Sequence, residues 1–251
     1  MKVNQRTLLV ISIAMLVGLW LTITLPFQIA SAQTPTPIES QSHPLSTSVL
    51  PLENIQAKLP DWARLVDIRS VNANIRLDIR YATTNNFLKK KLYPEARCIL
   101  RASVAEKLSL VQNDLQKRGL GLKVFDCYRP LSVTKQMWAA LPDERYVANP
   151  ARGSRHNRGA AVDLTLVNRN GSELVMPTGF DDFTEKAARN YQGSGVSAQA
   201  RKNSQLLEEV MRKYGFLPIT SEWWHFDSTD WQKFSILDIS FDDIPKPIGA
   251  K

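Results

Sequence analysis

An uncharged apolar run near the amino terminus decides how much of this chain can form a folded domain. Leu8–Leu25 carries no charged residue, follows the basic residues Lys2 and Arg6, and precedes Ala30-Ser31-Ala32. These are the parts of a secretory signal, so we predict a signal peptide at residues 1–32. The alternative is an uncleaved membrane anchor, since the run is nearly long enough to span a bilayer. Either way we expect an exported protein, located in the periplasm or cell envelope.

The segment after this signal has a composition that does not support a fold of its own. Residues 33–54 are rich in Pro, Ser, Thr and Gln and contain few large apolar side chains. Such a segment cannot bury enough surface to fold alone, so we predict a flexible linker. Residues 55–251 hold the regular hydrophobic periodicity and have the length of one ordinary domain, without an internal repeat.

That domain combines helical and extended patterns in an irregular order. Val104, Leu108 and Val111 recur at helical spacing beside the capping box Ser103–Glu106, which predicts a helix over 103–118. Because no strand–helix–strand rhythm repeats, we expect an α+β domain with a small central antiparallel sheet flanked by helices. We further predict helices at 133–140, 183–191 and 198–214, extended segments at 68–81, 122–127, 160–166 and 221–226, a loop at 147–158, and a strand or docked tail at 234–241.

Charge and cysteine content narrow the partners and the chemistry. The net charge is +8, but Lys and Arg are scattered and form no basic helix with interleaved aromatic residues. We therefore expect no nucleic-acid partner, and membrane contact only through an uncleaved signal segment. Cys98 and Cys127 are the only cysteines, and without a C-x-x-C pair they do not predict a zinc site. Outside the cytoplasm they form a disulfide or remain two buried thiols; the sequence leaves both open.

The first candidate metal-binding segment joins a loop to a strand, in the run Ser154-Arg155-His156-Asn157-Arg158-Gly159-Ala160-Ala161-Val162-Asp163. The glycine lets the chain turn closely, and the strand presents Asp163 on the same side as the small Ala161. Small neighbours leave room for an ion beside the carboxylate, and imidazole nitrogen and carboxylate oxygen are both good zinc ligands. Taken alone, this spacing more often marks a surface histidine and a capping aspartate.

The second candidate segment is Glu222-Trp223-Trp224-His225-Phe226. A carboxylate and a histidine are costly to bury in aromatic surroundings without a partner. A metal would satisfy His225 and give Glu222 a function as a base, whereas the alternative is a strand end with an exposed glutamate. Residues three apart on an ideal strand point to opposite faces, so we expect Glu222 on a bend before the strand or beside a bulge.

Together the two segments predict a catalytic metal centre. Three protein ligands and an open position are typical of catalytic zinc, so we predict one Zn²⁺ per chain, held by His156, Asp163 and His225. Glu222 is then the candidate general base. The helical H-E-x-x-H motif is absent from the sequence, which excludes that class of zinc protease. Arg129 is a candidate for stabilising an oxyanion, and a surface salt bridge is the alternative for it.

The two segments resemble the motifs of the zinc peptidases that cleave D-Ala-D-Ala, which share a small sheet-based fold with the hedgehog amino-terminal domain. The resemblance covers about residues 65–230. Three further segments resemble the VanX-like dipeptidase branch of these enzymes: Tyr81-Ala82-Thr83 followed by Asn86-Phe87, Asp126-Cys127-Tyr128-Arg129-Pro130, and the doubled tryptophan Trp223-Trp224.

This resemblance implies hydrolysis of the D-alanyl-D-alanine dipeptide to two D-alanines, linked to cell-wall turnover. It implies that a small dipeptide is the partner of the site. By position it implies the following roles: zinc ligands His156, Asp163 and His225; base Glu222; oxyanion stabiliser Arg129; Ser154 on the substrate carboxylate or backbone; Asp181, or else Asp182, on the substrate ammonium; and Tyr81 at the border of the pocket.

Two other functions are consistent with parts of the sequence. A D,D-carboxypeptidase that removes terminal D-Ala from peptidoglycan stem peptides would use the same ligands, but it needs an open groove for the rest of the stem. A non-catalytic envelope-binding domain could keep the metal, but Glu222 and Arg129 argue against it. The resistance enzymes of the VanX-like branch act on the cytoplasmic D-Ala-D-Ala pool, so the predicted export argues against a resistance role.

Overall fold

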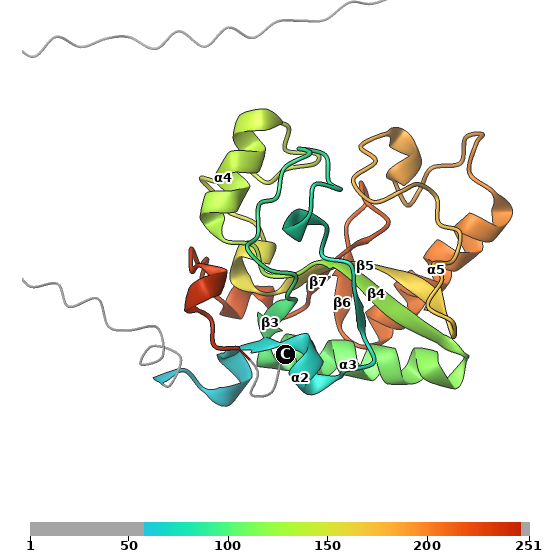
Figure 1. Cartoon of the computed structure of the whole chain (residues 1–251). Helices are drawn as coiled ribbons and strands as arrows, with labels where there is room; N and C mark the ends of the chain where they lie inside the picture. The colour runs from blue at the N-terminus through green and yellow to red at the C-terminus, as the bar shows by residue number, and fades with distance from the viewer. Residues whose placement is uncertain (1–57, 247–251) are drawn as a thin grey trace, which may run out of the picture. The chain divides into compact units, whose positions relative to one another are not determined.

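A five-stranded sheet lies at the centre of residues 58–246, the part of the chain that this computed structural model describes (Figure 1). The predicted signal peptide and linker lie outside these residues. The strand order is β2-β4-β5-β7-β6, and every neighbouring pair is antiparallel except β2–β4, which is parallel. The strands of the sheet are β2 (Arg76–Leu77), β4 (Leu120–Asp126), β5 (Ala161–Asn168), β6 (Phe216–Pro218) and β7 (His225–Ser228).

Helices and a second small sheet surround this central sheet. Helix α3 packs against β4 and α5, and α5 also contacts β5 and β6. Figure 1 shows α3 along one side of the sheet, with α4 and long connecting segments on the other side. Strands β1 (Leu65–Asp67) and β3 (Ile99–Arg101) form an antiparallel pair; the helices are α2 (Ile68–Val71), α3 (Ala102–Lys117), α4 (Leu131–Ala140) and α5 (Ala198–Lys213).

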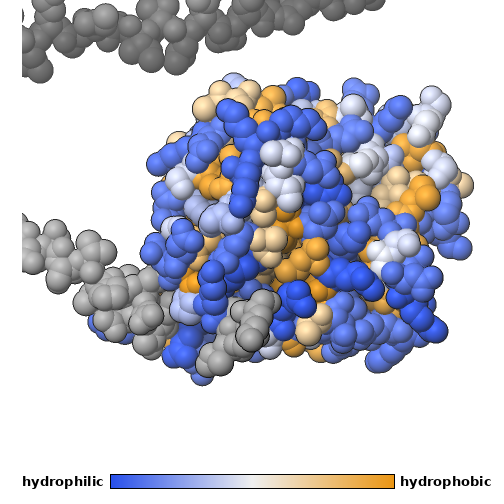
Figure 2. Space-filling view, viewed as in Figure 1, coloured by the Kyte–Doolittle hydropathy of each residue, from blue (hydrophilic) through white to orange (hydrophobic). Residues whose placement is uncertain are grey.

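Short 3₁₀ turns connect these elements. They span Asp61–Ala63, Arg80–Ala82, His156–Arg158, Glu185–Ala187, Trp231–Lys233 and Phe241–Asp243. No helix within the described part of the chain is both long and apolar enough to cross a bilayer. On the face seen in Figure 2, hydrophilic residues surround several separate areas of apolar residues.

The α+β architecture is confirmed, as are the three longest helices and the strands at 122–127 and 160–166. The predicted capping box is wrong, because β3 runs directly into α3 and makes Arg101 the N-cap residue. Ser103 therefore lies inside the first turn, where its buried hydroxyl has no hydrogen-bond partner. Residues 68–71 are helical rather than extended, because the Asp67 side chain accepts a hydrogen bond from the Arg69 N–H and begins α2.

Other differences concern short elements. Strands β1, β3 and β6 were not predicted, because three residues are too few to show alternation. Within 183–191 only Glu185–Ala187 forms a helical turn. The segment 234–241 is a docked tail and not a strand: Leu237 donates its N–H to Asn157 O and accepts from Leu131 N–H.

The two cysteines form a disulfide, which resolves the alternative left open by the sequence. Cys98 precedes β3 and Cys127 follows β4, so the bond joins the small sheet to the central sheet. Both cysteines are fully buried in the core.

Helix α3 provides a stability test with its own control. Leu108 is 0 % exposed and Leu110 is 50 % exposed on the same helix. We expect Leu108→Ala to lower the free energy of unfolding by about 2–5 kcal/mol, because it leaves a cavity in a close-packed core. Leu110→Ala should change it by less than about 0.5 kcal/mol. Urea denaturation measures both, and equal effects would contradict the packing of α3 described above.

Candidate active site

The pairing of β5 with β7 brings two predicted ligands together. Asp163 lies directly opposite His225 in the antiparallel register, and the Leu164 N–H donates to Trp224 O at 3.1 Å just beyond that pair. Residues directly opposite one another on antiparallel strands lie on the same face of the sheet. The sheet therefore places these side chains next to each other although they are distant in sequence.

His156 reaches the same place from the turn that leads into β5. Gly159 ends this turn with φ +67°, a left-handed conformation that glycine adopts without strain. The buried Asn157 side chain donates to Arg129 O at 2.8 Å and so anchors the turn. The Asn157 contact and the Gly159 conformation together set the direction of the His156 ring.

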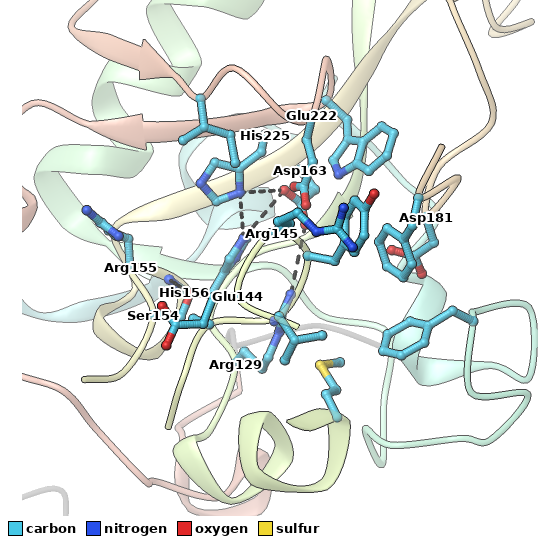
Figure 3. Close-up of a pocket in the computed structure, with 18 of the residues that line it drawn as sticks. Arg129, Glu144, Arg145, Ser154, Arg155, His156, Asp163, Asp181, Glu222 and His225 are labelled. Carbon is cyan, nitrogen blue, oxygen red and sulfur yellow. Dashed lines mark hydrogen bonds and ion pairs between the residues drawn. The ribbon is translucent and has the colours of Figure 1, made fainter. Parts of the chain in front are cut away.

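The three side chains converge on a common space (Figure 3). His225 Nδ1 lies 3.0 Å from Asp163 Oδ1 and 3.1 Å from His156 Nε2. His156 Nε2 lies 3.4 Å from Asp163 Oδ1. Two donors about 2.0–2.1 Å from a tetrahedral zinc lie about 3.3 Å from each other. The three separations therefore match a set of ligands around one such ion.

The partners of the other ring nitrogens show why this space favours a cation. His156 Nδ1 lies 2.7 Å from Cys127 O, which can only accept, so this nitrogen carries the proton and Nε2 has a free lone pair. His225 Nε2 lies 2.9 Å from Asp227 Oδ1 and its Nδ1 lies 3.0 Å from Asp163 Oδ1, so both nitrogens of this ring face carboxylates. A bound metal ion would take the place of the proton between His225 Nδ1 and Asp163 Oδ1 and would accept a lone pair from each ring.

The pKa values of two buried ligands also indicate a site for positive charge. Burial lowers the pKa of His225, but Asp227 and Asp163 outweigh it and raise this pKa to about 10. Burial raises the pKa of Asp163, but His156 and His225 hold it well below its usual value. The group of side chains thus stabilises positive charge at its centre. Within residues 58–246, only these three residues form a group of His, Cys, Asp or Glu suited to hold a metal ion.

Glu222 lies beside the three ligands without a hydrogen bond or ion pair to any of the described residues. It precedes β7, and the chain bends at Trp223 and Trp224, so the predicted strand over 221–226 begins only at His225. The bend lets Glu222 and His225 face the same space, as we expected from the alternation of strand residues. Burial raises the pKa of Glu222 to about 8, so this carboxyl group holds and releases a proton near neutral pH.

Three hydrogen bonds, one from the backbone and two from an arginine side chain, hold the segment that carries Glu222. The Trp223 N–H donates to Ala187 O at 3.0 Å. The Arg189 side chain donates to Ile219 O at 2.9 Å and to His225 O at 3.0 Å. Arg189 was not predicted to serve the site, because nothing in its local sequence marks it.

Arg129 is buried beside the ligands and does not form a surface salt bridge. Its Nη2 lies 2.7 Å from Asp126 Oδ2 and 4.0 Å from Asp163 Oδ2. Asp126 is fully buried and also accepts from the Tyr93 hydroxyl at 2.7 Å. Burial alone would lower the pKa of Arg129, but Asp126 and other neighbours raise it above its ordinary value, so the guanidinium stays charged.

A carboxylate borders the cavity next to the ligands, and it belongs to Asp181. The Tyr81 hydroxyl donates to Asp181 Oδ1 at 3.0 Å, and both residues line the cavity. Asp182, the alternative, instead accepts from the Thr184 N–H and does not line the cavity. Asp181 has φ +60°, a conformation that is uncommon for residues other than glycine, although Asp adopts it more readily than most.

Ser154 also lines the cavity, and its hydroxyl accepts from the His156 N–H at 3.2 Å. The cavity measures about 130 Å³, which suits a ligand well below drug size. The structure thus brings every predicted site residue to one cavity. Sequence analysis missed Asp227 and Asp126, whose contacts exist only in the folded chain, and the lining residues Tyr146, Phe183 and Arg145.

Two histidines and a carboxylate around a common space, with a further carboxylate and an arginine beside them, define the class of metal-dependent hydrolases. The sequence matches the D-Ala-D-Ala dipeptidase family, Peptidase M15, over residues 61–246. The chain belongs to this family and is a metallopeptidase.

Curated relatives carry the name of the same family. A D-alanyl-D-alanine dipeptidase of Escherichia coli (strain K12) is 34% identical over 183 residues, covering 73% of this chain and 94% of the relative. A D-alanyl-D-alanine dipeptidase of Enterococcus faecium is 32% identical over 173 residues, covering 61% of this chain and 85% of the relative.

Solved structures of vancomycin resistance peptidases are more distant. A variant of the D,D-pentapeptidase VanY in complex with Zn(II) has a TM-score of 0.34 and 15% identity, covering 54% of this chain and 75% of that chain. The D,D-dipeptidase VanXYg in complex with a D-Ala-D-Ala phosphinate analogue has a TM-score of 0.30 and 20% identity, covering 66% of each.

The turn that carries His156 provides a test of the site's framework. A Cβ at Gly159 would lie 3.0 Å from Leu65 Cδ2, and its φ of +67° is unfavourable for any other residue. We expect Gly159→Ala to lower the free energy of unfolding by about 1–3 kcal/mol. Gly179→Ala is the control, since nothing lies within 4 Å of a Cβ there. Thermal denaturation of the two variants checks this, and equal stabilities would contradict the strained position.

Proposed function

We propose that this chain hydrolyses the D-alanyl-D-alanine dipeptide to two D-alanines and takes part in cell-wall turnover. The observation that carries the proposal is the position of Asp181, a half-buried carboxyl group on the same small cavity as the candidate metal ligands. A free dipeptide has an ammonium group one residue from its scissile bond, so it needs both features in one site.

The proposed cofactor is one Zn²⁺ per chain, held by His156, Asp163 and His225. The donor set of two imidazole nitrogens and one carboxylate oxygen fits zinc, and the outer nitrogen of each ring has an acceptor partner, which would leave the inner nitrogen to the metal. Zinc in such a site acts as a Lewis acid and lowers the pKa of water to near 7.

Glu222 is the proposed general base and acid. Its carboxyl group borders the cavity, lies beside the ligands and has a pKa raised to about 8 by burial. It takes the proton from the attacking water and passes it to the amine of the departing D-alanine. A bound zinc ion would favour the ionised form of this carboxyl group, which is the form that can accept a proton.

Arg129 is the proposed stabiliser of the negative charge that develops on the carbonyl oxygen of the scissile bond. Its guanidinium is buried, is held by Asp126 at 2.7 Å and needs no reorganisation during the reaction. A fixed positive charge in a site with little water stabilises a developing oxyanion far more than it would in bulk solvent.

The two ends of the dipeptide have different proposed partners. Asp181, oriented by the Tyr81 hydroxyl, binds the substrate ammonium. Ser154 binds the substrate carboxylate or backbone. Aromatic rings pack beside Asp181, with Phe87 and Tyr146 both in contact with Phe183 at centroid distances of 5.2 and 4.7 Å. Phe87, Tyr146 and Phe183 line the same cavity as Asp181. Large side chains at this end support the dipeptide over a D,D-carboxypeptidase substrate, which needs an open groove.

The role of Glu222 is tested by Glu222→Gln, which keeps the shape of the side chain and removes its base. We expect kcat for D-Ala-D-Ala to fall by about 10²–10⁴-fold with zinc binding retained. His156→Ala should lose both zinc and activity, whereas His43→Ala, in the predicted linker, should keep both. Zinc content is measured on the purified variants, and full activity of Glu222→Gln would contradict the proposed base.

The role of Asp181 is tested with two substrates, free D-Ala-D-Ala and the same dipeptide with an acylated amine. We expect cleavage of the free dipeptide only, because the acylated form has no ammonium for Asp181 to bind. Asp181→Asn should raise KM for the free dipeptide by about 10-fold or more, since a charged hydrogen bond contributes about 1.5–3 kcal/mol. Asp182→Asn is the matched control. Efficient cleavage of the acylated dipeptide would indicate a carboxypeptidase instead.

Export to the periplasm or envelope is proposed from the signal at residues 1–32. Fractionation of cells that produce the full chain should place the mature protein outside the cytoplasm, with an amino terminus at Gln33. A mature domain that stays in the cytoplasm would contradict export, and a retained amino terminus in the membrane fraction would indicate an anchor.

A further inference from the structure

The disulfide lies next to the contacts that orient the candidate metal ligands. Cys127 O accepts from His156 Nδ1 at 2.7 Å, so the ring that offers Nε2 to the metal is held by a cysteine's own carbonyl. The Cys127 N–H donates to Asp126 Oδ1 at 2.9 Å, and Asp126 in turn holds Arg129 at 2.7 Å. Cys127 therefore contacts the candidate ligand His156 through its carbonyl and Asp126, the partner of Arg129, through its N–H.

The chain leaves the central sheet at this residue. The register of β4 with β5 shifts between Val124 and Asp126, and the pairing ends at Asp126–Asp163. Beyond that point no ladder hydrogen bonds fix the direction of the backbone. The carbonyl that holds His156 thus belongs to a peptide that the sheet itself does not position.

Two ties to β3 replace the sheet at this point. The Tyr128 N–H, in the same peptide group as Cys127 O, donates to Ile99 O at 2.9 Å. The disulfide joins Cys127 to Cys98, the residue directly before β3. Because N–H and C=O point in opposite directions across a trans peptide, holding the N–H on Ile99 aims the carbonyl at His156. The disulfide limits the movement of the Cα atom about which this peptide would otherwise rotate.

We propose that the Cys98–Cys127 disulfide is a positioning element of the metal site, acting through Cys127 O on His156 and through Asp126 on Arg129. The inference rests on the proposed metal site and is independent of the proposed substrate. Partners that orient a ligating histidine commonly change metal affinity by about 10–100-fold when they are lost.

The test is the zinc affinity of Cys98→Ala/Cys127→Ala, measured by competition with a chelating dye and without any substrate. We expect zinc to bind about 10–100-fold more weakly than to the wild-type chain. The visible spectrum of the Co²⁺-loaded protein should also shift, because the orientation of a ligand changes. Val111→Ala, in the buried face of α3, is the control for a loss of core stability away from the site.

The outcomes of this test distinguish a failure of the positioning role from a failure of the proposed metal site. Zinc affinity that is unchanged in the cysteine variant, or equally weakened in Val111→Ala, would overturn the positioning role. Failure of the oxidised wild-type chain to bind zinc would instead refute the proposed function. If the variant does not fold, the wild-type chain is produced and kept in the reduced state, and its two free thiols are counted. We expect the reduced chain to bind zinc about as weakly as the variant would. Equal zinc affinity of the reduced and oxidised chains would overturn the proposal.

Discussion

The convergence of His156, Asp163 and His225 on one small space is the constraint on which the rest of this structure depends. Two imidazole lone pairs and a carboxylate oxygen lie within 3.0–3.4 Å of one another. Such an arrangement is unfavourable unless positive charge occupies its centre. The fold holds it in place through the register of β5 and β7 and through the turn before β5. The same strand pairing therefore forms both the sheet and the site.

Buried polar groups around the ligands offset the energetic cost of this convergence. Asp227 holds the far side of the His225 ring, and Cys127 O holds that of His156. Asp126 compensates the charge of Arg129, which would otherwise be costly to bury. Each contact also sets a direction, since a neutral ring whose outer nitrogen donates a hydrogen bond presents a lone pair on its inner side. Stability and preparation of the site for chemistry therefore come from the same hydrogen bonds.

Local elements were predicted well where a pattern extends over several turns or strand positions, as in α3 and β5. Prediction failed where tertiary contacts outweigh local preference. Ser103 resembles an N-cap, but β3 continues to Arg101 and shifts the start of α3. Arg189 and Asp227 serve the site through contacts with residues distant in sequence, and no local signal marks either of them. Asp181 and Asp182 were separated only by the direction of their side chains.

The sequence by itself determined the identity of the candidate metal ligands, because the residue types and their spacing in Ser154–Asp163 and Glu222–His225 indicate which chemistry is possible. It also determined the α+β class, since amphipathic periodicity is a local property of the chain. Only the tertiary structure decided which atoms face one another, which partners hold the outer nitrogens of the histidines, and that the cysteines join beside the site. Those properties depend on the pairing of β4, β5 and β7 across many residues, and distance in space is not encoded in local periodicity.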